Sequence, residues 1–96
     1  MANTDNFNTV TVGNTATLIM AANADRHSFL MANTSAGTVF VGPTSSVTIA
    51  NGTPILQNGS LGEDSSGTKL YQSDVYGIVS AGTSDVRYWE RVRGTS

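Results

Sequence analysis

Residues 26–42 read RHSFLMANTSAGTVFVG, and this stretch decides the fold. Two apolar runs flank NTSAG, whose small and polar residues favour a turn. In both runs apolar side chains recur at every second position, which is typical of half-buried β-strands. We therefore predict a hairpin that belongs to a scaffold rather than to the mouth of a site. Its expected core residues are Phe29, Met31, Val39 and Val41, and its expected turn residues are Asn33 and Gly37.

The rest of the chain repeats this pattern of short apolar runs separated by Gly, Asn, Ser and Thr. Such spacing predicts an all-β fold, either a single small antiparallel β-sandwich (jelly-roll-like) or a partly open barrel. We expect an extended N-terminal arm over residues 1–9, the β-sandwich domain over 10–93 and a short tail over 94–96. The expected strands are 10–12, 16–20, 28–32, 38–41, 47–50, 53–56, 70–71, 75–79 and 86–92.

Two local signals refine this outline. In VTIANGTPIL, Asn51-Gly52 suits a type I′ turn, so residues 47–56 are predicted to form a hairpin. Pro54 has no amide proton to donate, which places its strand at a sheet edge. In TATLIMAANADR, the Thr and Ile content favours a strand followed by a turn, although one helical turn around 21–25 is an alternative.

The composition bounds the function. The 96 residues are 39% hydrophobic and only 12% charged, with a net charge of −2. No basic footprint for nucleic acid or membrane is therefore present. There is no cysteine, and the start MANTDNFNTV has no basic or apolar leader pattern, so we expect folding in a cytoplasm. A chain this small without a covalent staple often depends on partner subunits for stability.

Titratable groups offer little for catalysis. His27 is the only histidine of the chain. Because it follows Asp25 and Arg26 at the expected start of a strand, we interpret it as a surface or interface residue. Glu63 and Asp64, in GEDSSGTK, are too few for a calcium loop, which uses six or more oxygen ligands, so a connecting loop is expected. We predict no enzyme activity, no cofactor and no metal site.

The last strand, DVRYWERVR, divides into two faces because side chains alternate. Val86, Tyr88 and Val92 give one face a core pattern that Glu90 interrupts. Two interpretations of the other face stay open: Arg planes stacked on Trp89 at the surface, or a docking surface, since Trp and Arg are enriched at interfaces. The candidate contact residues are Phe7, Arg26, Arg87, Trp89, Arg91 and Arg93, with Arg26 alternatively anchoring a loop.

Several of these residues resemble a pattern in small β-rich proteins of tailed-bacteriophage virions. The pattern has an Arg, alternating apolar residues ending in Asn, a short turn and Val-x-Val-Gly, then a Val-Thr-x-x-Asn-Gly hairpin and later Val-Tyr-Gly-Ile and Val-Arg. The resemblance covers roughly residues 26–90, and it departs at Leu56–Gly59, where relatives tend to have Pro-Gly. The matching residues are Arg26, Phe29, Met31, Asn33, Val39, Val41, Gly42, Val47, Thr48, Asn51, Gly52, Val75–Ile78, Val86 and Arg87.

The resemblance implies a structural virion protein, made in the host cytoplasm and located on the capsid surface. Its expected role is that of a decoration (cement) protein that stabilises contacts between capsomers. The implied partners are the major capsid protein and copies of the chain itself, as a dimer or trimer. The alternative is a fibre, spike or tail module that binds a host-surface glycan on Trp89, Tyr88, Tyr71 or Tyr76.

Overall fold

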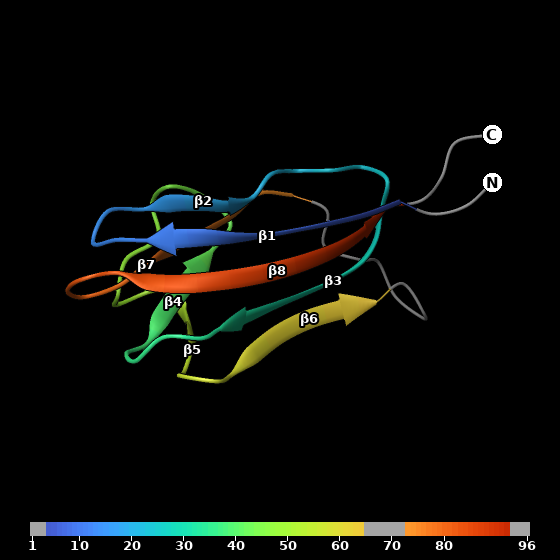
Figure 1. The fold of residues 1–96 in the computed structure, drawn as a ribbon. Coiled ribbons are helices and arrows are strands. Elements are labelled where there is room, and N and C mark those ends of the chain that lie inside the picture. The colour runs from blue at the N-terminus through green and yellow to red at the C-terminus, as the bar shows by residue number, and fades with distance from the viewer. Residues whose placement is uncertain (1–3, 65–72, 93–96) are drawn as a thin grey trace.

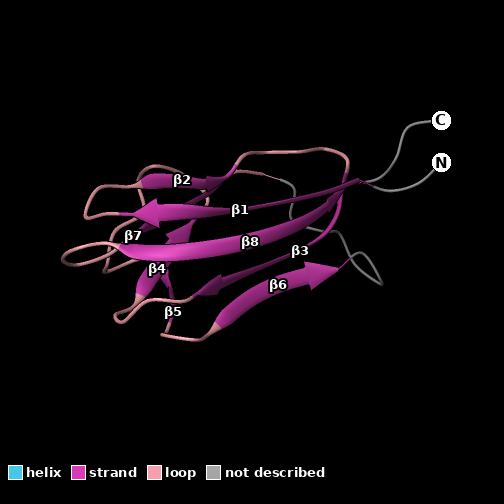
Figure 2. Cartoon of the chain, in the orientation of Figure 1, coloured by secondary structure: helices cyan, strands magenta, loops and turns pink. Residues whose placement is uncertain are grey.

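The computed structural model describes residues 4–64 and 73–92, and every regular element in these ranges is a β-strand (Figures 1 and 2). None of the described segments forms a helix long and apolar enough to cross a membrane. The strands are β1 (Thr4–Val12), β2 (Thr17–Met20), β3 (Arg26–Asn33), β4 (Val39–Gly42), β5 (Thr53–Ile55), β6 (Ser60–Asp64), β7 (Val75–Ile78) and β8 (Ser84–Val92).

The strands form two four-stranded antiparallel sheets. Sheet A has the order β1-β8-β3-β6 and sheet B the order β2-β7-β4-β5. The first strand therefore pairs with the last, the second with the seventh, the third with the sixth and the fourth with the fifth. The chain follows the path of one long hairpin folded over into two layers, which is the jelly-roll arrangement. The predicted all-β sandwich is confirmed.

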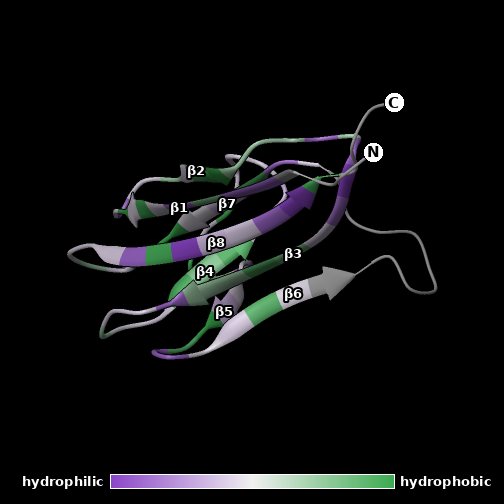
Figure 3. Cartoon of the chain, turned by 45° about the vertical axis from the view of Figure 1, so that its right-hand side comes forward, coloured by the Kyte–Doolittle hydropathy of each residue, from purple (hydrophilic) through white to green (hydrophobic). Residues whose placement is uncertain are grey.

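The core lies between the sheets and is built by the alternation seen in the sequence. Along β8, Val86 and Glu90 are buried whereas Arg87, Trp89 and Arg91 are exposed. In Figure 3, which is coloured by hydropathy, β4 is mainly apolar, whereas β8 is largely hydrophilic or neutral with an apolar band. The buried apolar cluster consists of Val12, Ile19, Met20, Phe29, Met31, Val39, Val41, Ile55, Val75, Val79 and Val86.

The predicted hairpin over residues 26–42 is wrong in one respect. Its four apolar residues are buried as expected, but β3 lies in sheet A and β4 in sheet B. Residues 34–38 therefore cross from one layer to the other. Asn33 and Gly37 do shape this connection, since Asn33 Nδ2 donates to the Gly37 carbonyl at 2.7 Å and Gly37 has a φ of 96°. Strands that face one core from opposite sides have the same period of two as a hairpin, so the pattern could not separate them.

The predicted hairpin over 47–56 is also corrected. Residues 47–50 form no strand: 47–48 are irregular and 49–51 form a turn, and β5 pairs with β4 instead. The Thr48 hydroxyl accepts the Asn51 amide, and the Asn51 side chain accepts the Thr48 amide at 2.7 Å. These local hydrogen bonds compete with a strand ladder. Asn51 has no positive φ, so the type I′ turn does not form, whereas Pro54 lies on an edge strand as predicted.

Strand boundaries differ elsewhere. The first strand begins at Thr4 rather than Val10, so residues 4–9 of the expected arm belong to sheet A. Residues 60–64, expected as a connection, form β6 because they pair with β3. The strand and turn predicted over 16–25 are observed without the alternative helical turn. The strand predicted at 70–71 lies outside the described residues.

Gly77 on β7 leaves room for the inward side chains of the two neighbouring strands of sheet B, β2 and β4. A Cβ at this position would lie 2.6 Å from Cδ1 of Ile19 and 3.3 Å from Cγ1 of Val39. We expect Gly77→Val to lower the free energy of unfolding by about 1–3 kcal/mol, since overpacking forces side chains off their rotamers. Urea denaturation measures this loss. Gly13→Val is the control because nothing lies within 4 Å of its added Cβ; equal losses in both variants would contradict the packing argument.

Candidate docking surface on sheet A

A row of apolar side chains crosses the outer face of sheet A. Phe7 on β1 is directly opposite Trp89 on β8, and Trp89 is opposite Leu30 on β3. All three point away from the core, with 77% of Phe7, 53% of Trp89 and 49% of Leu30 exposed. We call these three residues the apolar row. Cross-strand neighbours of this kind pack against one another, so the row forms one continuous surface.

The backbone hydrogen-bond pattern between β1 and β8 brings the side chains of Phe7 and Trp89 close together. The backbone amide of Asn33 donates to Gly59 and its carbonyl accepts from Asn58, so Asn33 faces away from β8. Its partner Val86 consequently turns its own hydrogen-bonding groups toward β1. Counting along the unbroken β1–β8 register, Phe7 and Trp89 form a pair without mutual backbone hydrogen bonds. Side chains approach most closely in pairs of this type.

The apolar row borders an open groove of about 380 Å³, lined by Phe7, Leu30, Ala32, Arg87, Tyr88 and Trp89. Arginines lie on either side of Trp89 along β8. Arg91 donates from Nε to Asp5 at 3.0 Å, and this hydrogen bond is the main cause that lowers the pKa of the Asp5 carboxyl. Arg87 has no ion-pair partner within residues 4–64 and 73–92. The groove thus has an apolar lining beside the guanidinium of Arg87, which is available to pair with an acidic group of a partner.

The predicted outer face of the last strand is therefore observed for Arg87, Trp89 and Arg91, whereas Arg93 lies outside the described residues. Stacking of arginine on Trp89, one of the two interpretations, is not the arrangement found in the described part of the chain. The cation–π contact there is between Arg26 and Phe29, at 5.6 Å from the ring centroid. Leu30 was missed by sequence reasoning, although its place between the inward-facing Phe29 and Met31 signals an outward side chain.

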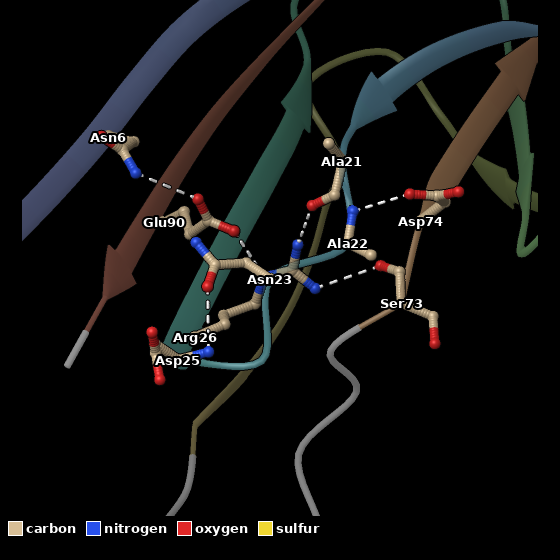
Figure 4. A network of polar contacts seen from close by, with 9 residues as sticks. All are labelled: Asn6, Ala21, Ala22, Asn23, Asp25, Arg26, Ser73, Asp74 and Glu90. Atoms are coloured by element: carbon tan, nitrogen blue, oxygen red, sulfur yellow. Dashed lines mark hydrogen bonds and ion pairs between the residues drawn. The ribbon is translucent and has the colours of Figure 1, made fainter.

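Arg26 does not belong to this surface. It was a candidate protein contact, but the structure buries it to 1% exposure at the start of β3. Its Nε donates to Glu90 Oε2 at 2.6 Å, and its terminal nitrogens donate to the carbonyls of Ala21 and Ser73 at 2.7 and 3.2 Å (Figure 4). The alternative prediction, that Arg26 anchors a loop, describes this arrangement.

The Arg26–Glu90 pair explains the polar interruption in the core face of β8. Glu90 is 5% exposed, and its other carboxylate oxygen accepts from Asn6 Nδ2 at 3.2 Å. Buried charges are stable only when paired and hydrogen-bonded. The network joins β8 and β1 of sheet A to the segments that follow β2 and precede β7 in sheet B (Figure 4). It holds one end of the sandwich together rather than presenting reactive groups to solvent.

The remaining candidate groups are dispersed. His27 is half-buried on β3, and Asp25 is exposed in the preceding turn. Glu63 and Asp64 lie in β6, not in a loop. Across the described ranges, no three His, Cys, Asp or Glu residues cluster closely enough to hold a metal ion.

No protein-family model and no curated protein sequence matches this chain. Among solved structures, the fold is similar to a protein from a study of Bacillus endospore appendages, described as a novel family of disulfide-linked pili. The similarity has a TM-score of 0.54 at 15% sequence identity and covers 98% of this chain and 88% of that one. At this identity the match concerns the fold alone.

Proposed function

We propose that this protein is a non-catalytic structural subunit that works in many copies on the surface of a larger assembly. The observation that carries the proposal is the apolar row, because three large apolar side chains stand exposed together on the outer face of one sheet. Contiguous exposed apolar surface marks interaction sites in soluble proteins. Covering each of these side chains on docking contributes on the order of 1 kcal/mol or more.

The finer proposal is a decoration protein that docks on the outer surface of a bacteriophage capsid. The resemblance of residues 26–90 to small phage virion proteins supports it, whereas the fold similarity to a protein of disulfide-linked endospore pili supports only the coarser proposal of a structural protein. Arg87, on the rim of the groove, suits an acidic shell surface. Modest contacts of each copy add up over a symmetric shell, since every bound copy stabilises the assembled state.

A capsid-binding experiment tests this proposal. We expect the wild-type chain to sediment with capsids that lack it and to raise their heat resistance. Leu30→Thr and Trp89→Thr should each weaken binding roughly tenfold, since each removes apolar contact area worth about 1.4 kcal/mol. Leu56→Thr is the matched control, because Leu56 is 64% exposed but lies outside the apolar row. Absence of the wild-type chain from the capsid pellet would overturn the capsid role.

The exposed Trp89 beside Phe7 also favours a second candidate, a module that binds a glycan on an aromatic platform. Of the tyrosines named for this role, Tyr76 and Tyr88 are half-buried and Tyr71 lies outside the described residues. Glycan-array signals from the wild-type chain that disappear in Trp89→Ala would favour this candidate over capsid binding.

A further inference from the structure

The four edge strands of the sandwich differ in how they resist pairing with another chain. β5 has three residues and contains Pro54, β2 has four residues and a register shift, and β6 has five residues. Short strands, proline and irregular register all discourage edge-to-edge association. β1, at the edge of sheet A, has nine residues in unbroken register with β8 and contains no proline or lysine. β1 is therefore the edge best suited to accept a further strand.

The backbone groups that β1 offers can be identified. Val86 turns its backbone hydrogen-bonding groups toward β1, so its partner Val10 forms hydrogen bonds with β8. Because this direction alternates along a strand, the amides of Asp5, Phe7 and Thr9 point away from sheet A. An independent contact agrees: the Thr9 amide donates to the Asn8 side chain at 2.8 Å instead of to β8. An open groove of about 440 Å³ lies beside this edge, lined by residues 5–8, 20–23, 88 and 90.

The side chain of Phe7 also favours pairing at this edge. It is the most exposed of the large apolar side chains, and it stands on this same edge. Trp89 flanks it on one side, but none of the strands in residues 4–64 and 73–92 flanks it on the other. A strand added antiparallel to β1 would place a residue beside Phe7, and aromatic pairs are among the most stabilising cross-strand neighbours. An identical strand supplies an aromatic residue at the required position.

We propose that two copies of this chain associate through β1, antiparallel about a two-fold axis at Phe7. Phe7 then lies opposite Phe7 of the second copy, Asp5 opposite Thr9, and Asn6 opposite Asn8. The outward amides and carbonyls of residues 5, 7 and 9 complete a ladder across the axis, and the Thr9 amide exchanges the Asn8 side chain for the Asp5 carbonyl of the second copy. The two A sheets become one eight-stranded sheet, in which the apolar rows of both copies join.

The residues of β1 are self-complementary in this register. Asp5 faces the Thr9 hydroxyl of the second copy rather than another carboxylate, and Asn6 faces an amide that both donates and accepts. No like charges are opposed along residues 4–10. The inference extends the proposed function by naming the surface through which copies associate, but its test uses the isolated chain and does not depend on a capsid.

Sedimentation of the purified chain over a range of concentrations provides the first test. We expect a monomer–dimer equilibrium in the wild type. Thr9→Pro removes one outward amide while leaving the β1–β8 ladder intact, and it should weaken the dimer tenfold or more. Thr9→Val keeps the amide and serves as the matched control, with wild-type association. A purely monomeric wild type, or a dimer unchanged in Thr9→Pro, would overturn the proposal.

A second variant and a second measurement guard against a folding defect in Thr9→Pro. Phe7→Arg places two cations opposite one another on an exposed position, so the monomer should fold and the dimer should weaken at least tenfold. In hydrogen exchange, the amides of Asp5 and Phe7 should be protected in concentrated samples and exposed on dilution. The amides of Asn8 and Val10, which face β8, should stay protected at both concentrations. Concentration-independent exchange at Asp5 and Phe7 would show that β1 is not the interface.

Discussion

Arg26→Met is expected to lower the free energy of unfolding by about 3–5 kcal/mol, enough to unfold much of a domain of this size. The substitution keeps the length of the side chain but removes the cation that pairs with Glu90. Glu90 would remain as an unpaired charge in the core, and the carbonyls of Ala21 and Ser73 would each lose a donor. Urea denaturation followed by circular dichroism measures the loss.

The double variant Arg26→Met/Glu90→Leu separates the cost of the orphaned charge from the value of the pair. Well-packed apolar replacements of a buried ion pair are often neutral, so we expect the double variant to be more stable than Arg26→Met alone. Arg91→Met is the control, since its pair with Asp5 is solvent-exposed and exposed pairs contribute little. A single variant as stable as the wild type would show that the network does not hold the layers together.

The sequence alone indicated Glu90, one of the two charged residues of this network. Glu90 stood out because it interrupts the apolar face of the last strand, and a buried carboxylate requires a partner. Its partner lies 64 positions away, and alternation within single strands carries no information on which strands are neighbours. Arg26 was therefore recognisable as a loop anchor or a surface contact, but not as the counter-ion of Glu90.

The same limit explains the errors in topology. Periodicity of two identified the inward side chains of β3, β4 and β8 correctly. It did not distinguish a hairpin from a crossing between layers at residues 34–38, nor did it show that the polar segment 4–9 continues a strand. Asn6 and Asn8 carry no apolar signal, and their place in β1 is fixed by pairing with β8. Such non-local pairing is a property of the assembled sheet.

The candidate surface was predictable to a greater extent, because exposure follows directly from alternation. Trp89 and Arg87 were assigned to the outer face from the strand pattern alone, and the structure agrees. Their assembly with Phe7 and Leu30 into one row required the register across three strands. The structure thus combines an interior closed at one end by the Arg26 network with an outer face of sheet A that exposes the apolar row. That division suits a protein that works by binding.

Asn33→Ala is the second substitution with a large expected effect, about 3 kcal/mol of lost stability. Asn33 is fully buried at the end of β3, where the chain leaves sheet A for sheet B. Its Nδ2 donates to the carbonyls of Gly37 and Ile55 at 2.7 and 3.0 Å, and its Oδ1 accepts the Ser35 amide. Alanine leaves these three backbone groups without their partner. The bond to Ile55 is buried and the other two are partly buried, and a buried unsatisfied group costs about 1–3 kcal/mol.

The effect should be specific to the crossing between the layers. The Asn33 side chain links residues 35–37 to the end of β5, so its removal should also raise hydrogen exchange at the Ser35 amide well before global unfolding. Asn14→Ala, at an exposed asparagine between β1 and β2, should leave both the urea midpoint and this exchange unchanged. If Asn33→Ala matched Asn14→Ala in both measurements, the crossing would be held by the packing of β3 and β4 alone.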